Sequence, residues 1–157
     1  NYLKSRIPIQ ILFGLFITNS FLIDQSIFFR YYSYYFLTSS ITLFLILFFR
    51  AYLSFFGFGK LISFLKNFTR DILSREKMGY VLKSISIISS IFPNITCLIR
   101  ATVFKVIFSE VKGLKIIIGI RKDENKSFKS HAWISLNNKV ILNDDLKIDL
   151  YKVIYTL

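Results

Sequence analysis

The first fifty residues are dominated by two long stretches that carry no charge. Ile7–Ile23 contains 17 uncharged residues and Tyr31–Phe49 contains 19, and charged side chains bound both stretches. Apolar runs of this length favour helices over strands, so we expect helices over about residues 7–23 and 32–66. The second stretch approaches the ~20 apolar residues that a bilayer span requires.

Three features bear on whether these helices enter a membrane. Arginines at their edges and a cluster of tyrosines resemble interfacial anchors, namely Arg6, Arg30, Arg50, Tyr31, Tyr32, Tyr34 and Tyr35. Hydroxyl side chains weaken the second stretch as a span, namely Ser33, Thr38, Ser39, Ser40 and Thr42. The first stretch lacks the small-residue cleavage site of a signal peptide. Buried or peripheral helices are therefore favoured over a membrane hairpin, and we expect a cytoplasmic protein, either free or at the inner face of the membrane.

The hydrophobic pattern predicts two further helices, over residues 71–90 and 96–112. The second should begin after Thr96, a good helix N-cap that follows a break at Pro93. Apolar residues then recur at helical spacing, namely Leu98, Ala101, Phe104, Ile107, Phe108 and Val111. Gly113 is expected to end this helix in the C′ position.

The pattern then changes to the alternation of β-strands. We expect strands over residues 115–121, 129–136 and 139–143, and a short amphipathic tail over Leu146–Tyr155 as strand or helix. Asn137-Asn138 is suited to a two-residue hairpin turn, because asparagine tolerates positive φ. Helices followed by a small antiparallel sheet predict an α+β fold in which the helix after Thr96 packs on the sheet.

The candidate chemistry begins with Cys97, the single cysteine of the chain. It falls in the first turn of the predicted helix, where unpaired N–H groups and the positive end of the helix dipole stabilise a thiolate. The alternative is a small buried apolar residue, which is common for a free cysteine. Taken alone, Cys97 favours that alternative.

His131, the single histidine, and Asp144 can be placed together by counting along the hairpin. A two-residue turn pairs Leu136 with Lys139, and the same register places His131 directly opposite Asp144 on one face of the sheet. A three-residue turn would select Asp145 instead. A thiol, an imidazole and a carboxylate are the nucleophile, base and orienting acid of a catalytic triad. Together, Cys97, His131 and Asp144 favour catalysis over three separate packing roles.

Composition excludes several other classes. One cysteine forms no internal disulfide and suits a reducing compartment, and one cysteine with one histidine is too few for a zinc site. No glycine-rich phosphate loop or dinucleotide motif is present, so we expect neither metal nor cofactor. The net charge of +12 attracts an acidic peptide, a partner protein or a membrane surface. No nucleic-acid recognition pattern accompanies it, and a solvated lysine-rich surface is an equal alternative.

The order of nucleophile helix, histidine strand and acid strand is papain-like. The strings CLIRA, LKIIIGIRK and SHAWISLNNKVILND resemble the transglutaminase-like cysteine peptidases of lasso-peptide biosynthesis, which remove the leader from a precursor peptide. The motif positions of that family fall here on Cys97-Leu98, Arg100-Ala101, Gly119, His131-Ala132-Trp133 and Asn143-Asp144. Upstream, Ile41–Leu65 resembles the leading helix of the family, and Ser74–Ser90 resembles the helix before the cysteine. Residues 41–157 would then form the peptidase domain.

The resemblance implies roles for these residues. Cys97 would attack the scissile carbonyl, His131 would accept and return the proton, and Asp144 would orient His131. The backbone N–H of Cys97 would stabilise the oxyanion, and Trp133 would shield the triad, although a plain core tryptophan fits equally well. A transglutaminase-like acyltransferase and a non-catalytic membrane or scaffold protein are the alternatives.

The resemblance also implies partners. They are the precursor peptide, an asparagine-synthetase-like lasso cyclase and a leader-recognition protein. Residues 1–40 are too few and too apolar for the recognition domain, so we expect a separate protein. That segment is predicted to be an apolar extension, either membrane-associated or a fragment, since the chain begins with Asn1. The expected docking surface is the basic loop before His131, with Arg121, Lys122, Lys126 and Lys129.

Overall fold

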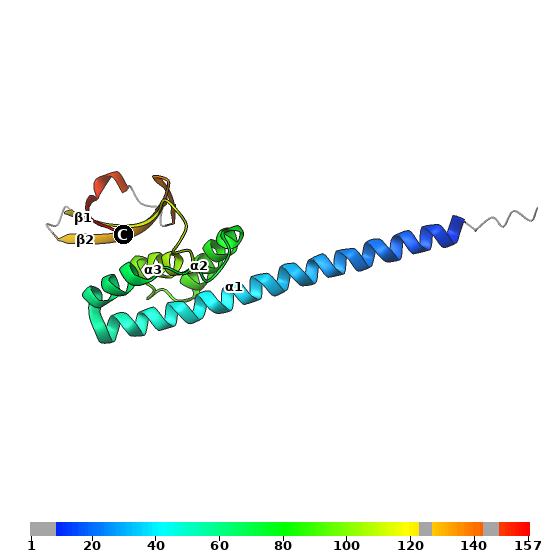
Figure 1. Cartoon of the computed structure of the whole chain (residues 1–157), viewed down its shortest axis with the longest axis horizontal. Coiled ribbons are helices and arrows are strands. Elements are labelled where there is room, and N and C mark those ends of the chain that lie inside the picture. The colour runs from blue at the N-terminus through cyan, green and yellow to red at the C-terminus, as the bar shows by residue number, and fades with distance from the viewer. Residues whose placement is uncertain (1–8, 123–126, 143–147) are drawn as a thin grey trace, which may run out of the picture. The chain divides into compact units, whose positions relative to one another are not determined.

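The computed structural model describes residues 9–122, 127–142 and 148–157, with side chains from Tyr32 onward (Figure 1). The chain divides into two compact units, Asn1–Leu37 and Thr38–Leu157. In the described residues, the first unit contains helix alone, and the second contains the other helices and a four-stranded antiparallel sheet. The predicted α+β class is confirmed, since helices occupy the first part of the chain and strands the last.

Helix α1 runs without interruption from Ile9 to Asn67, apart from a kink at Gly57. Two separate helices, 7–23 and 32–66, were therefore the wrong prediction, and residues 24–31 contain no turn for a membrane hairpin. Charged residues there interrupt the apolar run but do not break a helix, because the segment contains neither glycine nor proline. The kink lies at Gly57 instead, whose φ of 73° is readily accessible only to glycine.

One described segment, Tyr32–Asn67 of α1, is long and apolar enough to cross a bilayer, with a hydropathy of 2.0. The core helices of soluble proteins meet the same criterion. Several of its side chains are in fact buried in the core of the second unit, namely Ile46, Phe49, Leu61, Ile62 and Leu65.

Helix α3, Cys97–Ile107, begins where the sequence predicts. Thr96 is the N-cap, and its hydroxyl accepts a hydrogen bond of 3.4 Å from the backbone N–H of Ile99. This bond satisfies one of the N–H groups that the first turn of a helix leaves without a partner in the helix. The local chemistry of Thr96 therefore sets Cys97 as the first helical residue.

The predicted end of α3 was wrong, since the helix stops at Ile107 and not before Gly113. The Ile107 carbonyl accepts hydrogen bonds from the backbone N–H groups of Ile72 and Leu73, at 3.0 and 3.4 Å. The predicted start of the preceding helix, at residue 71, was also wrong: residues 71–74 lie outside helix, and α2 is Met78–Ile91, preceded by the short 3₁₀ helix η1, Arg75–Lys77. A distant segment thus supplies donors to the last carbonyl group of α3, which has no partner within the helix.

Polar contacts hold the same end of α3. The Asp71 carboxylate accepts a hydrogen bond of 2.6 Å from the backbone N–H of Glu110. Lys105 donates to the carbonyl groups of Ser109 and Leu114, at 3.1 and 3.0 Å. Burial lowers the pKa of Lys105, and the nearby Asp71 carboxylate partly opposes this effect. Gly113, with φ of 80°, then turns the chain into the sheet.

The sheet has the strand order β3-β2-β1-β4 and is antiparallel throughout. Its strands are β1 Leu114–Lys122, β2 Phe128–Leu136, β3 Lys139–Leu142 and β4 Lys152–Thr156. The tail, predicted as strand or helix, contains the 3₁₀ turn η2, Ile148–Leu150, followed by β4. β4 pairs with β1, which makes β1 and β2 the central strands.

The hairpin between β2 and β3 bears out the predicted turn but not the predicted register. Asn137 and Asn138 both have positive φ, at 49° and 66°, and Leu136 pairs with Lys139. The register then shifts by one residue, so that Ile134 pairs with Leu142. Such bulges are frequent on edge strands. The unbroken register that placed Asp144 opposite His131 was therefore wrong.

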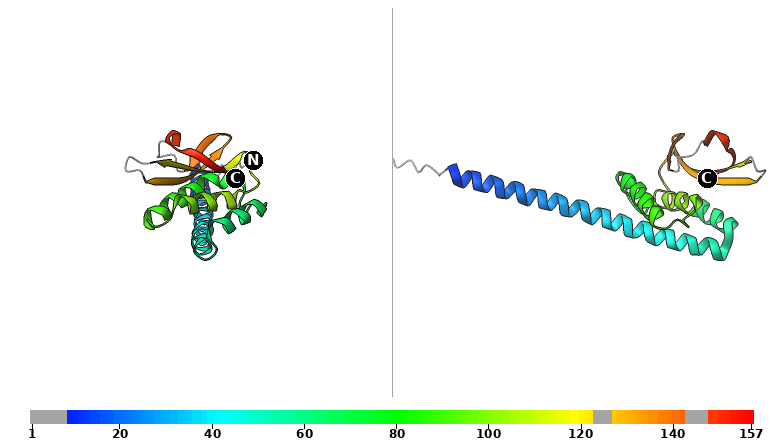
Figure 2. Two further views of the ribbon diagram at one scale, coloured as in Figure 1. Left: turned by 90° about the vertical axis from the view of Figure 1, so that its left-hand side faces the viewer. Right: turned by 180° about the vertical axis from the view of Figure 1, so that it is seen from behind.

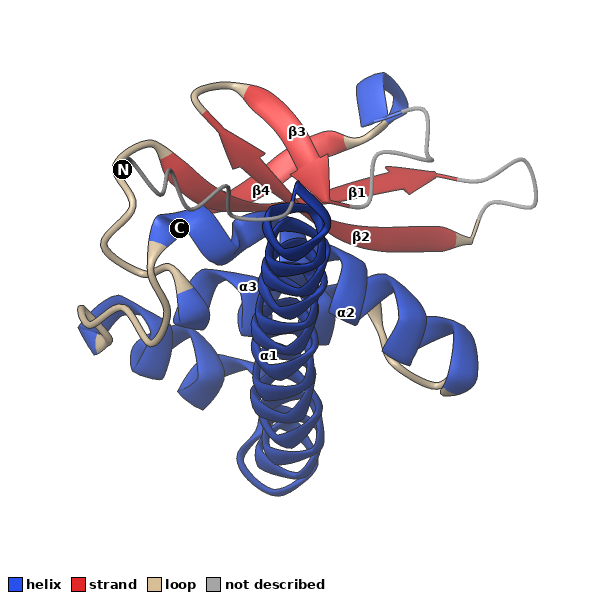
Figure 3. Cartoon of the chain, turned by 90° about the vertical axis from the view of Figure 1, so that its right-hand side faces the viewer, coloured by secondary structure: helices blue, strands red, loops and turns tan. Residues whose placement is uncertain are grey.

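The helices α2 and α3 lie on one side of the sheet (Figure 2 and Figure 3). The core joins residues of α1, α2, α3 and the sheet. Its largest fully buried members are Phe49, Phe104, Phe108, Ile46, Leu61, Ile85, Ile107, Ile116 and Ile134. On β2, Ala132 and Ile134 belong to this core. Because side chains alternate along a strand, His131 and Trp133 project from the opposite face.

Candidate active site

Cys97 lies at the junction of α3 and β2. Its Sγ accepts a hydrogen bond of 3.4 Å from the backbone N–H of Ala132, the residue after His131. As the first residue of α3, Cys97 also has a backbone N–H that cannot bond within the helix. The N–H donor and the helix N-terminus thus fix the position of Sγ beside β2. Cys97 is partly buried and packs against the core, and its Sγ also lines the cavity described below.

His131 is held in an aromatic cluster on β2. Its ring centroid lies 6.2 Å from that of Trp133 and 5.7 Å from that of Tyr151, and only 8% of the residue is exposed. Rings packed on two sides limit the orientations of the imidazole. Trp133 is itself buried, and it contacts His131 without lining the cavity described below.

Gly119 makes room for this cluster. It pairs with His131 across the β1–β2 ladder. A β carbon at Gly119 would lie 2.9 Å from Cη2 of Trp133 and 2.9 Å from Cβ of Tyr151, which is too close for either side chain to keep its place. The absence of a side chain at Gly119 therefore allows the two rings to pack beside His131.

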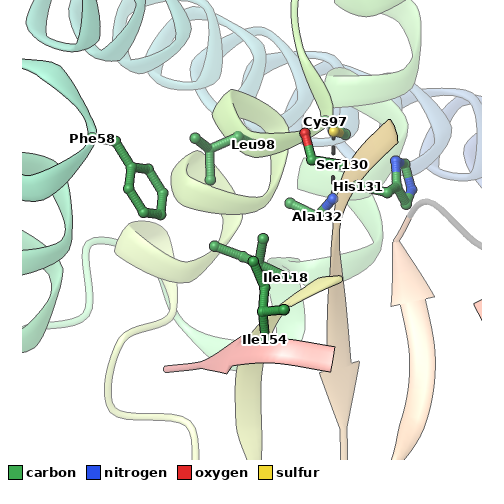
Figure 4. Close-up of a pocket in the computed structure, with 8 residues that line it drawn as sticks. All are labelled: Phe58, Cys97, Leu98, Ile118, Ser130, His131, Ala132 and Ile154. Carbon is green, nitrogen blue, oxygen red and sulfur yellow. Dashed lines mark hydrogen bonds between the residues drawn. The ribbon is translucent and has the colours of Figure 1, made fainter. Parts of the chain in front are cut away.

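Cys97 and His131 line one cavity of about 270 Å³ (Figure 4). Its other lining residues are Phe58, Leu98, Ile118, Ser130, Ala132 and Ile154. They come from the part of α1 after the kink and from α3, β1, β2 and β4. The fold thus brings the predicted nucleophile and base to adjoining elements, but the His131 ring lies across β2 from Cys97, on the sheet face opposite Ala132 (Figure 4).

Asp144, the predicted orienting acid, lies outside the described residues, as does Asp145. The register shifts between Ile134 and Ser135, and counting on from the Ile134–Leu142 pair would set position 145, not 144, opposite His131. Strand pairing therefore no longer supports Asp144. Asp144 remains a prediction carried by its place in the motif after His131-Ala132-Trp133.

The basic residues predicted to dock a partner lie at one end of the β1–β2 ladder. Arg121 pairs with Lys129, and Lys122 pairs with Phe128. The Arg121 guanidinium carbon also lies 5.2 Å from the centroid of the Tyr151 ring, a cation–π contact. Lys126 lies outside the described residues. Arg121 thereby connects the basic end of the ladder to the aromatic cluster around His131.

Several site residues were missed by sequence reasoning. Tyr151 is buried against His131. Phe58 on α1 and Ile154 on β4, which are far apart in the sequence, both line the cavity. Nothing local distinguishes them from other aromatic and aliphatic residues, and only the position of Phe58 next to the kink glycine was a signal. Ser130 could have been noticed as the neighbour of His131.

Among the described residues, no group of three or more histidine, cysteine or carboxylate side chains is placed to hold a metal ion. Cys97 and His131 supply a thiol and an imidazole to the lining of the cavity, and these residue types suit acyl transfer through a thioester.

Comparison with known proteins agrees with this chemistry. Residues 45–156, more than half of the chain, match the family described as the transglutaminase-like superfamily. The match includes Cys97, His131 and Asp144. No curated protein and no solved structure matches the chain. A thiol at the start of a helix and a histidine on the adjoining strand agree with this match. Because the match covers more than half of the chain, the chain belongs to the transglutaminase-like superfamily.

Proposed function

We propose that this protein is a cysteine peptidase that removes the leader from a ribosomally made lasso precursor peptide. The observation that carries the proposal is the position of Cys97, with Sγ 3.4 Å from the Ala132 N–H in a cavity that His131 also lines. Superfamily membership supports thiol-based acyl chemistry. The finer assignment to leader removal rests on the resemblance of the motifs around Cys97 and His131.

In the proposed reaction, the Cys97 thiolate attacks the scissile carbonyl carbon after His131 has taken the thiol proton. The backbone N–H of Cys97 is a candidate donor to the oxyanion, because it lies at the helix start. The C–N bond then breaks, and His131 returns the proton to the leaving amine. His131 next takes a proton from water, whose oxygen attacks the thioester and releases the leader with a free carboxylate. Asp144 would keep His131 oriented and stabilise its charged form.

Product analysis separates this function from the two alternatives. Incubation with the cognate precursor should give a leader with a free carboxyl end and a core peptide with a free amine, seen by mass spectrometry. A transglutaminase-like acyltransferase would instead join the acyl part to an added amine. A scaffold protein would give neither product, and a thiol-directed probe would not select Cys97. The core peptide would be the substrate of an asparagine-synthetase-like cyclase.

A third component is expected in this reaction, a separate leader-recognition protein. It would bring the leader to Cys97 and raise its effective concentration there. Arg121, Lys122 and Lys129 support this expectation, because they gather basic charge at the end of the β1–β2 ladder nearest to His131. Cleavage of the precursor should therefore be at least ~10²-fold faster with the recognition protein than without it.

The measurement is the initial rate of cleavage in the two mixtures. Replacing Lys122 by glutamate should reduce the gain from the recognition protein while leaving the slow unaided rate unchanged. Equal rates with and without the recognition protein would show that the chain reads the leader unaided.

The N-terminal helix supports a location in the cytoplasm at the inner face of the membrane. Part of α1 in the second unit is buried, but large apolar side chains on its other faces are exposed, namely Phe44, Leu47, Phe48, Phe55 and Phe56. Helices with an exposed aromatic face and basic flanks are typical of membrane surfaces.

Removal of the N-terminal segment should leave catalysis intact. A chain beginning at Ser39 retains Cys97, His131 and the sheet, and it keeps the hydrogen bond of 2.9 Å between the Ser39 and Ser84 hydroxyls. We expect precursor cleavage within about two-fold of the full chain and higher solubility, because a long apolar segment is lost. Loss of activity on truncation, or activity only in detergent, would instead favour a membrane-spanning arrangement.

A further inference from the structure

The cavity beside Cys97 has an apolar wall that the proposed chemistry does not require. Figure 4 shows the side chains of Phe58, Leu98, Ile118 and Ile154 arranged around the space next to Cys97 and Ala132. Cys97 and Ser130 lie together at one side of this space, and the His131 ring lies beyond them, across β2. A concave apolar surface with few polar groups at one edge is typical of a ligand site.

Two members of this wall are large apolar residues that remain open to solvent. Ile154 is 54% exposed and Phe58 is 45% exposed. The cavity volume of about 270 Å³ exceeds the ~150 Å³ that suffices to bind benzene. The space can therefore accept a side chain as large as that of phenylalanine.

The placement of Ile154 depends on a local irregularity of β4. Gly119 pairs with Val153 and Ile118 pairs with Tyr155, so Ile154 is the extra residue of a β-bulge. Bulges beside active sites redirect a side chain that regular alternation would send elsewhere. Ile154 lines the cavity together with Ile118, whereas Val153 does not line it.

We propose that this cavity binds a large apolar side chain, aromatic or leucine-sized, of the substrate residue next to the scissile carbonyl, and that Phe58 and Ile154 determine this preference. The inference rests on the proposed function only in taking Cys97 as the nucleophile. Loss of a single methylene from a group bound in an apolar pocket changes specificity by about 10- to 200-fold. A substrate with glycine at this position should consequently react at least ~10-fold more slowly.

The test uses thiol alkylation, which needs neither hydrolysis nor the precursor. Acetyl-phenylalanyl and acetyl-glycyl chloromethyl ketones form a carbon–sulfur bond with release of chloride. Because Cys97 is the single cysteine, intact mass gives the rate of its modification directly. On the full chain, the phenylalanyl reagent should label at least ~10-fold faster than the glycyl reagent.

Two matched variants locate the preference. Ile154→Lys should abolish the preference, so that the ratio of the phenylalanyl to the glycyl labelling rate falls to about 1. Val153→Lys is the control, since Val153 is the neighbouring residue with almost the same exposure, 51% against 54%. It should change neither rate. Thermal melting of both variants shows that each is folded, and Ile154→Asn replaces Ile154→Lys if that variant is not.

The remaining outcomes overturn the inference. Equal rates for the two reagents on the unmodified chain would exclude an apolar subsite, as would equal effects of Ile154→Lys and Val153→Lys. Resistance of Cys97 to both reagents would show that the cavity does not admit a ligand. A clear phenylalanyl preference without any precursor cleavage would keep the subsite and reject the peptidase function.

Discussion

Replacing Cys97 by alanine is expected to abolish cleavage of the precursor peptide. Removal of a catalytic nucleophile from a triad lowers turnover by about 10⁶-fold, because the remaining groups cannot form the covalent intermediate. The measurement is the rate of core-peptide release by the unmodified chain and the variant under the same conditions, with the recognition protein present.

The same substitution should leave the fold intact. Cys97 is only partly buried, and alanine removes one sulfur and its hydrogen bond to the Ala132 N–H. Loss of such a bond costs about 1 kcal/mol. A melting curve close to that of the unmodified chain is the control. Cleavage by Cys97→Ala near the original rate would remove the cysteine-peptidase function altogether.

The second large effect is expected at the orienting acid. Asp144→Asn should reduce turnover by about 10⁴-fold, because an amide in place of the carboxylate favours the wrong histidine tautomer. Asp145→Asn is the matched control, with the same chemical change at the adjacent position, and it should be nearly silent. Rates at saturating precursor separate this effect from weakened binding.

The comparison of these two variants also decides which of the two carboxylates orients His131. The bulge between Ile134 and Ser135 ends the register that selects Asp144, so the prediction depends on the position of Asp144 in the family-like motif. The opposite ranking, with Asp145→Asn the slow variant, would assign the orienting role to Asp145. Equal and small effects would mean that neither carboxylate orients His131.

The sequence predicted those features that depend on residues next to one another. Thr96 caps α3 with its own hydroxyl, which makes Cys97 the first helical residue. Asn137 and Asn138 adopt positive φ and form the two-residue turn, because asparagine tolerates that conformation. The order of nucleophile helix and histidine strand followed from the same kind of local pattern.

Boundaries set by distant partners could not be read in this way. Periodicity continued α3 to residue 112, but the helix ends at Ile107, whose carbonyl accepts hydrogen bonds from the distant residues Ile72 and Leu73. Charge suggested a break near Asp24, while the helix breaks at Gly57, since backbone freedom and not polarity decides where α1 can kink. The edge bulge in the β2–β3 pair likewise leaves no mark in the alternation of residue types.

By itself, therefore, the sequence determined which residues are the proposed nucleophile and base and which elements carry them. Capping and turn formation act within a few residues, so their chemistry is legible in the chain. Only the tertiary structure decided that Phe58, Ile118 and Ile154 form the wall of the cavity beside Cys97, and that Tyr151 packs on His131. These contacts join residues far apart in the chain. Apolar packing is not directional, so the residues next to Phe58, Ile118 or Ile154 in the sequence carry no pattern that reveals such a contact.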